Sequence, residues 1–457
     1  MSERQVRLGL AAYGTGWDAH AWRLPQATNA GLRDPSVILD IARIAERGKL
    51  DYVFAGSALG SEPNHLQRIF RWDNFIYASQ AAAITKHVGF VVSVNSSFEH
   101  PYLTARQVAT LDHFTGGRAA LNVVFGIDRN GGPDLNLGGN AIPDEQSKYT
   151  RGREFVEVVN KLLYSSWDDD FLLDDRANNQ LIRENSWHRI NHTGEHFQVR
   201  GPLNVPPPTQ SRVPVVQVGT SDDSVQFGAD LAQVRFSPYL GVERGKAEYQ
   251  RIKDLVAANG RDPEAFKILP GATFYIAGTK REAQRIYRNV INSQVTEEIP
   301  RAFSVALGID LSRVRNNERV VDIIDLESLS PTAFDDFLPP LGTEKRHIHN
   351  RDDRESIRTL VSAVGEDLTL RELYHHVQRI RQAAQPALVG DANTIADWVQ
   401  ENFEERVLDG VQFFPPYHRG PADLLVDLVV PELQRRGLFR TEYESDTLQG
   451  LLATDNG

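Results

Sequence analysis

The stretch HVGFVVSVNSSFEHPYLTARQVATLDHFTGGRAALNVVFG, residues 87–126, decides the fold class. Residues 87–96 are rich in β-branched side chains and almost continuously apolar, which predicts a strand buried on both faces. Residues 101–113 predict a helix that ends at Thr115-Gly116-Gly117. Residues 120–126 predict a second buried strand. A strand, a helix and a strand in succession are typical of a parallel sheet.

The same alternation extends in both directions along the chain. Further strands are expected at residues 5–12, 51–56, 213–219, 232–238, 266–278 and 411–415. Helices are expected between them, among others at residues 35–48, 74–86, 147–166, 222–232, 247–260, 392–404 and 421–436. Repeated units of this kind form either a doubly wound sheet or a (β/α)8 TIM barrel. A final strand at residues 411–415 would close an eight-stranded barrel.

Composition limits the class of protein. The chain has 457 residues, a formal net charge of −11 and no cysteine. Net acidity argues against nucleic acid or an anionic membrane as the main partner. The lack of cysteine excludes disulfides, thiolate nucleophiles and cysteine metal sites, and it fits a cytoplasmic protein. No signal peptide is recognisable, and no apolar run approaches the roughly 18 residues of a membrane helix.

One domain is expected to span residues 1–457, because α/β barrels of this length fold as single units. Residues 290–370 are polar and lose the alternation of strands and helices. We therefore expect them to form an insertion that packs over the active-site end of the barrel.

The active site of such a barrel lies at the carboxyl ends of its strands. The residues at these ends carry mostly hydroxyl and amide groups and almost no charge. They include Ser57, Ser93, Asn95, Asn122 and the run from Gly219 to Ser221. Such a set suits a bulky, hydrogen-bonding planar cofactor better than an acid–base pair. The alternative is that these ends are polar only because they meet water.

The segment VGTSDDSVQFG, residues 218–228, is the sharpest local signal. A strand ends in Gly219, Thr220 and Ser221, and a helix follows. The N–H groups at that helix start and the two hydroxyls could bind a phosphate. The alternative is helix capping by Ser221 or Asp222, which needs no ligand.

Other signals are weaker. The sequence contains neither a GxGxxG after the first strand nor a GxxxxGK[ST], so Rossmann and P-loop nucleotide binding lose support. His347, His349, His375 and His376 lack an accompanying carboxylate or cysteine pattern, and they are expected to be surface histidines rather than metal ligands. No metal site is predicted. The acidic run WDDDFLLDD, residues 167–175, indicates a solvated face or capped turn.

Seven stretches, in order along nearly the whole chain, resemble one family. It comprises the FMN-dependent monooxygenases of the nitrilotriacetate, pristinamycin IIA synthase and dibenzothiophene-sulfone type, in the bacterial luciferase-like superfamily. The stretches are AWRLP (21–25), AERGKLDYVFAGS (45–57), residues 87–124, YTRGREFVEVV (149–159), NHTGEHFQVRGPLNVPPPTQ (191–210), VPVVQVGTS (213–221) and VVPELQRRGLFRTEYESDTLQGLL (429–452).

The resemblance implies a TIM barrel with insertions, assembled as a homodimer or larger. It implies reduced FMN, supplied by a separate NAD(P)H:flavin reductase, that reacts with O2 to a C4a-(hydro)peroxyflavin and oxygenates a small organic substrate. Two alternatives stay open. One is a deazaflavin-dependent oxidoreductase of the same superfamily. The other is a noncatalytic relative that binds flavin or another ligand.

Site residues carried over from the family agree in part. Asn122, Tyr149 and Ser221 match, the last at the phosphate site, and Ser93 replaces a threonine. Ser57 stands where the family usually has aspartate, and Glu145 where it often has histidine. These two departures motivate the noncatalytic alternative.

The strand-end positions and the resemblance together imply that the cofactor is bound by Ser57, Ser93, Asn95, Asn122, Glu145, Tyr149 and Gly219–Ser221. Asn122 is also a catalytic candidate. A second candidate is His20, which lies in the loop after the first strand and could act as an acid or base beside the substrate.

Overall fold

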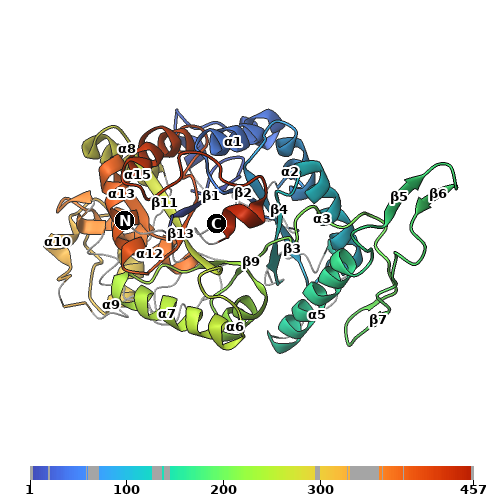
Figure 1. Cartoon of the computed structure of the whole chain (residues 1–457). Coiled ribbons are helices and arrows are strands. Elements are labelled where there is room, and N and C mark those ends of the chain that lie inside the picture. Colours follow the sequence, from blue (N-terminus) through green and yellow to red (C-terminus); the bar gives the residue numbers. More distant parts are fainter. Residues whose placement is uncertain are drawn as a thin grey trace.

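The computed structural model of the chain describes residues 4–18, 21–57, 59, 71–125, 136–137, 145–293, 299–326, 328–329, 360–362, 364–383 and 385–453. Its centre is a closed barrel of parallel strands (Figure 1). The barrel strands, in the order in which they pair, are β1 (Arg7–Ala11), β2 (Tyr52–Ala55), β3 (Gly89–Asn95), β4 (Ala119–Val124), β9 (Val215–Val218), β10 (Val234–Ser237), β11 (Lys267–Ile276) and β13 (Gly410–Phe413). The pairing of β13 with β1 closes the ring. The predicted TIM barrel is confirmed.

The long strand β11 pairs with three neighbours. Its first residues pair with β10, and Gly271 and Ala272 pair with β13. Its last residues, from Thr273 to Ile276, pair with the additional strand β12 (Ala387–Gly390). The carboxyl end of β11 therefore extends past the ring and carries a small extension of the sheet.

Helices surround the barrel (Figure 1). They are α1 (Pro35–Arg47), α2 (Asn74–Ala82), α3 (Pro101–Thr115), α5 (Glu145–Tyr164), α6 (Asp222–Leu231), α7 (Val242–Ala258), α8 (Lys280–Ser293), α9 (Ile299–Leu307), α10 (Val320–Ile323), α12 (Leu370–Ala383), α13 (Ala392–Glu404), α14 (Pro421–Leu424), α15 (Val430–Arg435) and α16 (Leu448–Leu452). Short 3-10 turns are η1 (Ala21–Arg23) and η2 (Ala30–Leu32), and a π-helical turn, η3 (Leu425–Val429), links α14 to α15. Among the described residues, none of the helices is both long and apolar enough to cross a membrane.

Side chains alternate across the barrel wall, as the period of a strand requires. One set packs outward against the helices in the main core. The other set fills the interior with apolar side chains, including Ala11, Tyr52, Val91, Ala120 and Val216. The barrel is therefore a packed core rather than a pore.

The C-terminal helix α16 closes the amino-terminal end of the barrel, where it lies near the centre of Figure 1. Leu448 and Leu452 belong to the interior core, and Leu448 N donates to Gly117 O just before β4 (2.9 Å). The preceding segment is fixed by Arg440, whose guanidinium donates to Asp51 Oδ1 at the start of β2 (2.8 Å). The tail therefore completes the barrel.

A second apolar core lies beside the barrel. It joins α8, α9 and α12 to Tyr275 at the carboxyl end of β11 and to Ala21 and Leu24 in the loop after β1. The described parts of residues 290–370 contribute α9 and α10 to it. Whether this insertion covers the active site stays a prediction, since residues 294–298 and 330–359 lie outside the described residues.

The prediction for two histidines was wrong. His375 and His376 are buried on α12, because that helix packs its apolar face into the second core. The sequence suggested surface residues because α12 lies next to a polar segment without a repeating pattern. His347 and His349 lie outside the described residues.

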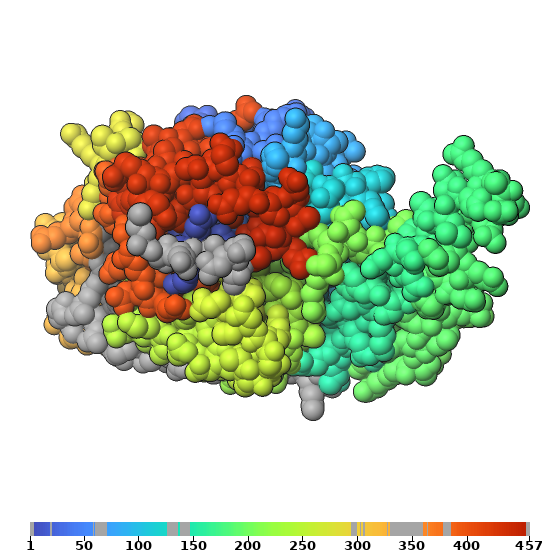
Figure 2. All heavy atoms as spheres, in the orientation of Figure 1, coloured from blue at the N-terminus to red at the C-terminus, as the bar shows by residue number. Residues whose placement is uncertain are grey.

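Residues 165–200 form an arm that projects from the barrel beside α5 (Figures 1 and 2). It holds two antiparallel hairpins, β5 (Leu172–Asp175) with β6 (Gln180–Ile182), and β7 (His192–Thr193) with β8 (Gln198–Val199). The acidic run is largely exposed there, as expected. Glu154 on α5 fixes the base of the arm, because its carboxylate accepts bonds from His192 Nε2 and from the backbone N–H groups of His196 and Phe197.

The proline-rich connector that follows the arm is anchored to α3. The buried carboxylate of Asp112 accepts hydrogen bonds from Thr209 N and Oγ1 and from Gln210 Nε2 (2.6 to 2.7 Å). The same glutamine amide donates to Ala119 O at the start of β4 (2.8 Å). This anchor sets where β9 enters the sheet next to β4.

Asp409, immediately before β13, ties the barrel together at its amino-terminal end. Its carboxylate accepts from Ile268 N, Tyr249 Oη and Arg4, and it pairs with Lys253 Nζ at 3.1 Å. Burial acts to raise the pKa of Asp409. The charges of Lys253, Lys267 and Arg4 outweigh that effect and hold the pKa below its ordinary value of 3.8.

We expect Asp409→Asn to lower the free energy of unfolding at neutral pH by about 3 kcal/mol, because it leaves buried Lys253 without its counter-charge. Urea unfolding measures the loss. A carboxylate with a depressed pKa stabilises the fold above its unfolded value and loses that effect as the pH falls through its folded value. The gap between wild type and variant should therefore narrow below pH 3.8. Exposed Asp254→Asn is the control, and an equal loss in both variants would contradict the assignment.

Candidate active site

Ser93 and Asn122 face each other inside the barrel on the paired strands β3 and β4. Val91 and Ala120, two residues earlier on each strand, belong to the interior core. Asn122 Nδ2 donates to Ser93 Oγ at 2.9 Å, and Asn122 is only 1% exposed. Within the part of the chain that the structure describes, no group donates to Asn122 Oδ1, which is fully buried. This oxygen is an acceptor without a protein partner at the centre of the predicted site.

The loop Gly219–Ser221 joins β9 to the start of α6. Ser221 Oγ accepts from Ser224 N (3.3 Å) and lies 2.9 Å from Tyr149 Oη on α5. A side chain at Gly219 would collide with Ser224, because an added Cβ would lie 2.1 Å from Ser224 Oγ. The loop therefore needs glycine and presents hydroxyls beside the first N–H groups of a helix.

The geometry of this loop is compatible with both predictions made for it, a phosphate site and a helix cap. Ser221 caps α6, and its hydroxyl and that of Tyr149 still converge at the helix start. The acidic residue that follows does not oppose an anion there, since the Asp222 side chain is 98% exposed and lies 3.8 Å from Arg251. The exposed Asp222 side chain therefore does not by itself exclude a phosphate from the helix start.

Arg235 on β10 supports this loop from behind and is 1% exposed. Its guanidinium donates to Gly219 O (2.7 Å), to Ser224 O (3.1 Å) and to Gln217 Oε1. Burial lowers the pKa of Arg235 to about 10, so the group remains charged at neutral pH. Its partners come from two other elements, which the sequence did not indicate. The only signal was a charged residue inside an otherwise apolar strand.

Aromatic rings line the barrel at the carboxyl ends of β1 and β13. The ring centroids of Trp17 and Phe414 are 4.6 Å apart, and those of Tyr13 and Trp17 are 5.4 Å apart. The guanidinium carbon of Arg71 lies 4.1 Å from the centroid of the Tyr13 ring. Two further aromatic residues near the strand ends do not join this cluster: Trp22 is exposed, and Phe125 packs against Tyr149 in the main core.

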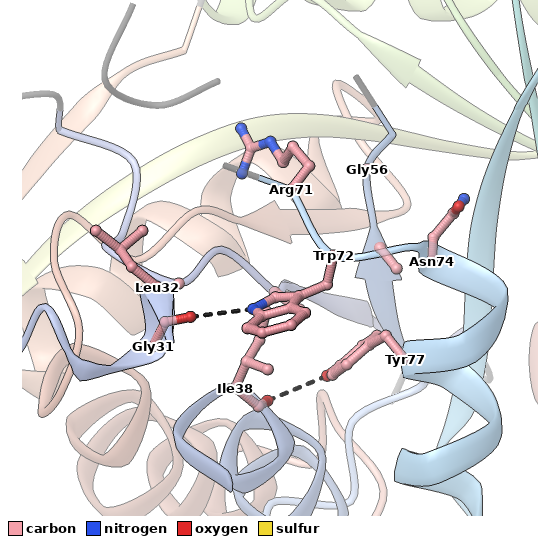
Figure 3. Close-up of a pocket in the computed structure, with 11 residues that line it drawn as sticks. Gly31, Leu32, Ile38, Gly56, Arg71, Trp72, Asn74 and Tyr77 are labelled. Atoms are coloured by element: carbon pink, nitrogen blue, oxygen red, sulfur yellow. Dashed lines mark hydrogen bonds between the residues drawn. The ribbon is translucent and has the colours of Figure 1, made fainter. Parts of the chain in front are cut away.

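A small pocket lies beside this cluster, between the ends of β1 and β2 and the helices α1 and α2 (Figure 3). Trp72 lines this pocket and donates through Nε1 to Gly31 O at 3.0 Å. Tyr77 Oη donates to Ile38 O at 3.3 Å, and burial raises the pKa of Tyr77. Figure 3 shows the Arg71 side chain pointing away from Trp72.

The remaining predicted residues are placed unevenly. Ser57 is half-buried after β2, and Thr220 is exposed. Asn95 Oδ1 accepts from Ser97 N (3.1 Å), so this amide serves the turn after β3. Glu145 begins α5, but its side chain is outside the described part, as is all of His20.

One acid at this end of the barrel was missed by the sequence analysis. Glu99 accepts a hydrogen bond from Asn95 N (2.6 Å), and burial raises its pKa above the ordinary value. It follows β3 in the turn before α3, where the sequence offered no pattern to separate it from a solvent-facing carboxylate.

Comparisons with known proteins agree with this geometry. The family model for luciferase-like monooxygenases matches residues 18–410. Component A of nitrilotriacetate monooxygenase from Aminobacter aminovorans is 34% identical over 462 residues, covering 98% of this chain and 96% of that protein. N-acetyl-S-(2-succino)cysteine monooxygenase from Bacillus subtilis (strain 168) is 32% identical over 450 residues with the same coverage. The solved structure of EDTA monooxygenase from Chelativorans sp. BNC1 has a TM-score of 0.78 and 25% identity, covering 98% of each chain.

We expect Arg235→Met to loosen the Gly219–Ser221 loop and to lower the free energy of unfolding by about 2 to 3 kcal/mol, because three buried acceptors lose a charged donor. Hydrogen–deuterium exchange should increase at the first amides of α6. Exposed Arg281→Met on α8 is the matched control. Unchanged exchange at α6 in Arg235→Met would show that the arginine does not hold the loop.

Proposed function

This chain belongs to the luciferase-like monooxygenase family, and we propose that it uses reduced FMN and O2 to oxygenate a small organic molecule. A separate NAD(P)H:flavin reductase would supply the reduced FMN. The observation that carries the proposal is the pair of hydrogen-bonding sites, at Asn122 and at Gly219–Ser221, on neighbouring strands of the barrel. The resemblance inferred from the sequence is confirmed by the full-length relatives.

The residues present fit the ring of a flavin. Asn122 Oδ1 is a buried acceptor, and the flavin ring carries an N–H donor of the kind that such an oxygen needs. Burying an amide oxygen without a partner costs about 1–3 kcal/mol, so a ligand that donates to it gains that much. Ser93 orients the amide by accepting from Asn122 Nδ2.

The residues also fit the phosphate of FMN. Ser221, Tyr149 and the first N–H groups of α6 would hold it, with Arg235 keeping the loop in place. Ser57, Asn95 and Glu145 stay proposed as cofactor contacts, and His20 as a substrate-side acid or base.

When bound, reduced FMN supplies the electrons that place one atom of O2 on the substrate and reduce the other to water. The chain's own part is to bind, orient and exclude water. The packed interior beneath Ser93 and Asn122 closes one side of the site to solvent. The rings of Tyr13, Trp17 and Phe414 offer an apolar surface for the substrate. A cytoplasmic location would bring the chain together with its reductase.

The deazaflavin alternative is not supported, because the full-length relatives are monooxygenases. The names of these relatives refer to substrates as different as nitrilotriacetate and, in a further relative, long-chain alkanes. Family membership therefore leaves the chemical class of the substrate open.

The function is tested by anaerobic titration with reduced FMN, followed by rapid mixing with isotopically labelled O2 and a panel of substrates. We expect tight binding of reduced FMN and label in an organic product. Binding without labelled product across the panel, with all O2 recovered as hydrogen peroxide or water, would favour the noncatalytic alternative. No binding of reduced FMN would refute the proposal.

We also propose a homodimer or larger assembly. Large apolar side chains are exposed on α2 and α3, namely Ile76, Leu103 and Phe114, the last 73% exposed. More are exposed on the neighbouring arm, including Leu172 and Leu181. Clusters of this kind on a soluble protein mark interaction surfaces.

Ser221→Asp should weaken binding of reduced FMN by at least about tenfold, or about 1.4 kcal/mol, because it opposes the phosphate with a negative charge. Aspartate still caps a helix, so α6 should stay folded. Fluorescence titration measures the affinity. Reduced riboflavin, which lacks the phosphate, should bind the variant and wild type equally. Exposed Ser312→Asp is the control for added charge, and an unchanged FMN affinity in Ser221→Asp would refute this phosphate site.

The double variant Leu103→Glu, Phe114→Glu should sediment with a lower mass than wild type, because it places charges in the proposed interface. Analytical ultracentrifugation measures the mass, and circular dichroism checks the fold. Arg281→Glu, at an exposed position of α8, is the control. A monomeric wild type, or an unchanged mass in the double variant, would argue against this surface.

A further inference from the structure

Gln385 places a buried amide beside the interior of the barrel. It precedes β12 and is 6% exposed. Thr273 N on β11 donates to Pro386 O at 3.0 Å, which fixes the backbone next to Gln385 against that strand. Among the described residues, none donates a hydrogen bond to Gln385 Oε1, which is fully buried. A buried amide oxygen without a donor lowers the stability of a fold, so this position is not explained by stability.

Gly271 on β11 makes room for this side chain. Leu269, two residues earlier, belongs to the interior core, so Gly271 faces the same interior. A Cβ added at Gly271 would lie 2.9 Å from Gln385 Nε2 and 2.9 Å from Phe414 Cε2. A glycine inside a strand is typical of a place that another group approaches closely. Here it brings the amide of Gln385 next to the Phe414 ring.

This amide lies across the barrel from the proposed flavin ring. Phe414 follows β13, whereas Asn122 belongs to β4. Three strands separate β13 from β4 on either path around the ring of eight, so the two residues lie on opposite sides. The half-buried ring of Trp17 packs on Phe414 with 4.6 Å between centroids. A flavin ring at Asn122 would therefore leave the aromatic cluster and the amide of Gln385 to the substrate.

We propose that Gln385 determines specificity by accepting a hydrogen bond from the substrate, so that this enzyme favours molecules with an N–H or O–H group on an aromatic or apolar body. The proposal rests on the proposed function and specifies its substrate class. The amide oxygen supplies the acceptor, and the rings of Trp17 and Phe414 contact the apolar body. A site of this kind rejects an analogue that lacks the donor, because its own acceptor then stays unpaired.

A packing role is the competing explanation, because the stem of Gln385 also fills space between β11 and Phe414. The two roles differ in what the loss of the amide changes. A packing residue affects stability and all ligands alike. A recognition residue affects only ligands that donate a hydrogen bond, and its replacement by an apolar side chain of similar size leaves the fold at least as stable.

The test compares wild type, Gln385→Leu and Gln385→Glu, each loaded anaerobically with reduced FMN. Exposed Gln250→Leu on α7 is the matched control. Fluorine NMR titrations use 4-fluorophenol, which donates through its O–H, and 4-fluoroanisole, which has a methyl group in place of that hydrogen. We expect wild type and control to bind the phenol about tenfold more tightly than the anisole. Gln385→Leu should lose this preference without a lower Tm. Gln385→Glu should keep it, because a carboxyl group retains an acceptor oxygen in either protonation state.

Three results would overturn the inference. They are a wild type that does not bind the phenol more tightly than the anisole, a Gln385→Leu variant that keeps the wild-type preference, and an equal loss of both probes together with a lower Tm in Gln385→Leu. The same titrations with flavin-free protein separate this inference from the proposed function. If wild type fails to bind reduced FMN yet prefers the phenol through Gln385, only the function fails.

Discussion

The closure of the barrel between β13 and β1 is the constraint on which the rest of the structure depends. Four backbone pairs, from Arg7 with Gly410 to Leu10 with Phe413, join the first and last strands of a chain more than four hundred residues long. Because the strands are parallel, their carboxyl ends all lie at one end of the closed barrel, and residues far apart in sequence meet there. Buried Asp409 stands at the start of β13 and bonds to the N-terminal segment, α7 and β11. The charged network around Asp409 thus stabilises the β13–β1 pairing at its amino-terminal end. At its carboxyl end, the aromatic rings of Tyr13 and Phe414 stack on each other.

Most of this architecture was predictable because the barrel strands are buried on both faces. Segments such as residues 87–96 are predicted clearly as strands, and loops that contain Gly or Asp mark where these strands end. The misses have one cause in common. Strand β12 has only four residues, and α12 follows a polar segment, so their identity depends on packing against β11 and α8 rather than on local pattern. The arm was missed as a pair of hairpins because its strands are short and exposed, with no alternation imposed by a core.

The sequence predicted those site residues that lie at the carboxyl ends of the barrel strands. Ser93 meets Asn122, and Tyr149 meets Ser221, because β3, β4, α5 and the β9 loop are neighbours in the barrel. The supporting cations could not be predicted in the same way. Arg235 and Arg71 act through partners on other elements, Gly219 and Tyr13, and no spacing in the chain announces such contacts. The sequence also could not separate a helix cap from an anion site at Ser221, since both use the same atoms.

The seal made by α16 bears on the order of events during turnover. Because Leu448 and Leu452 fill one end of the barrel, the proposed cofactor and its substrate would both have to enter and leave at the other end. Departure of the product and exchange of spent for fresh flavin would then use the same opening.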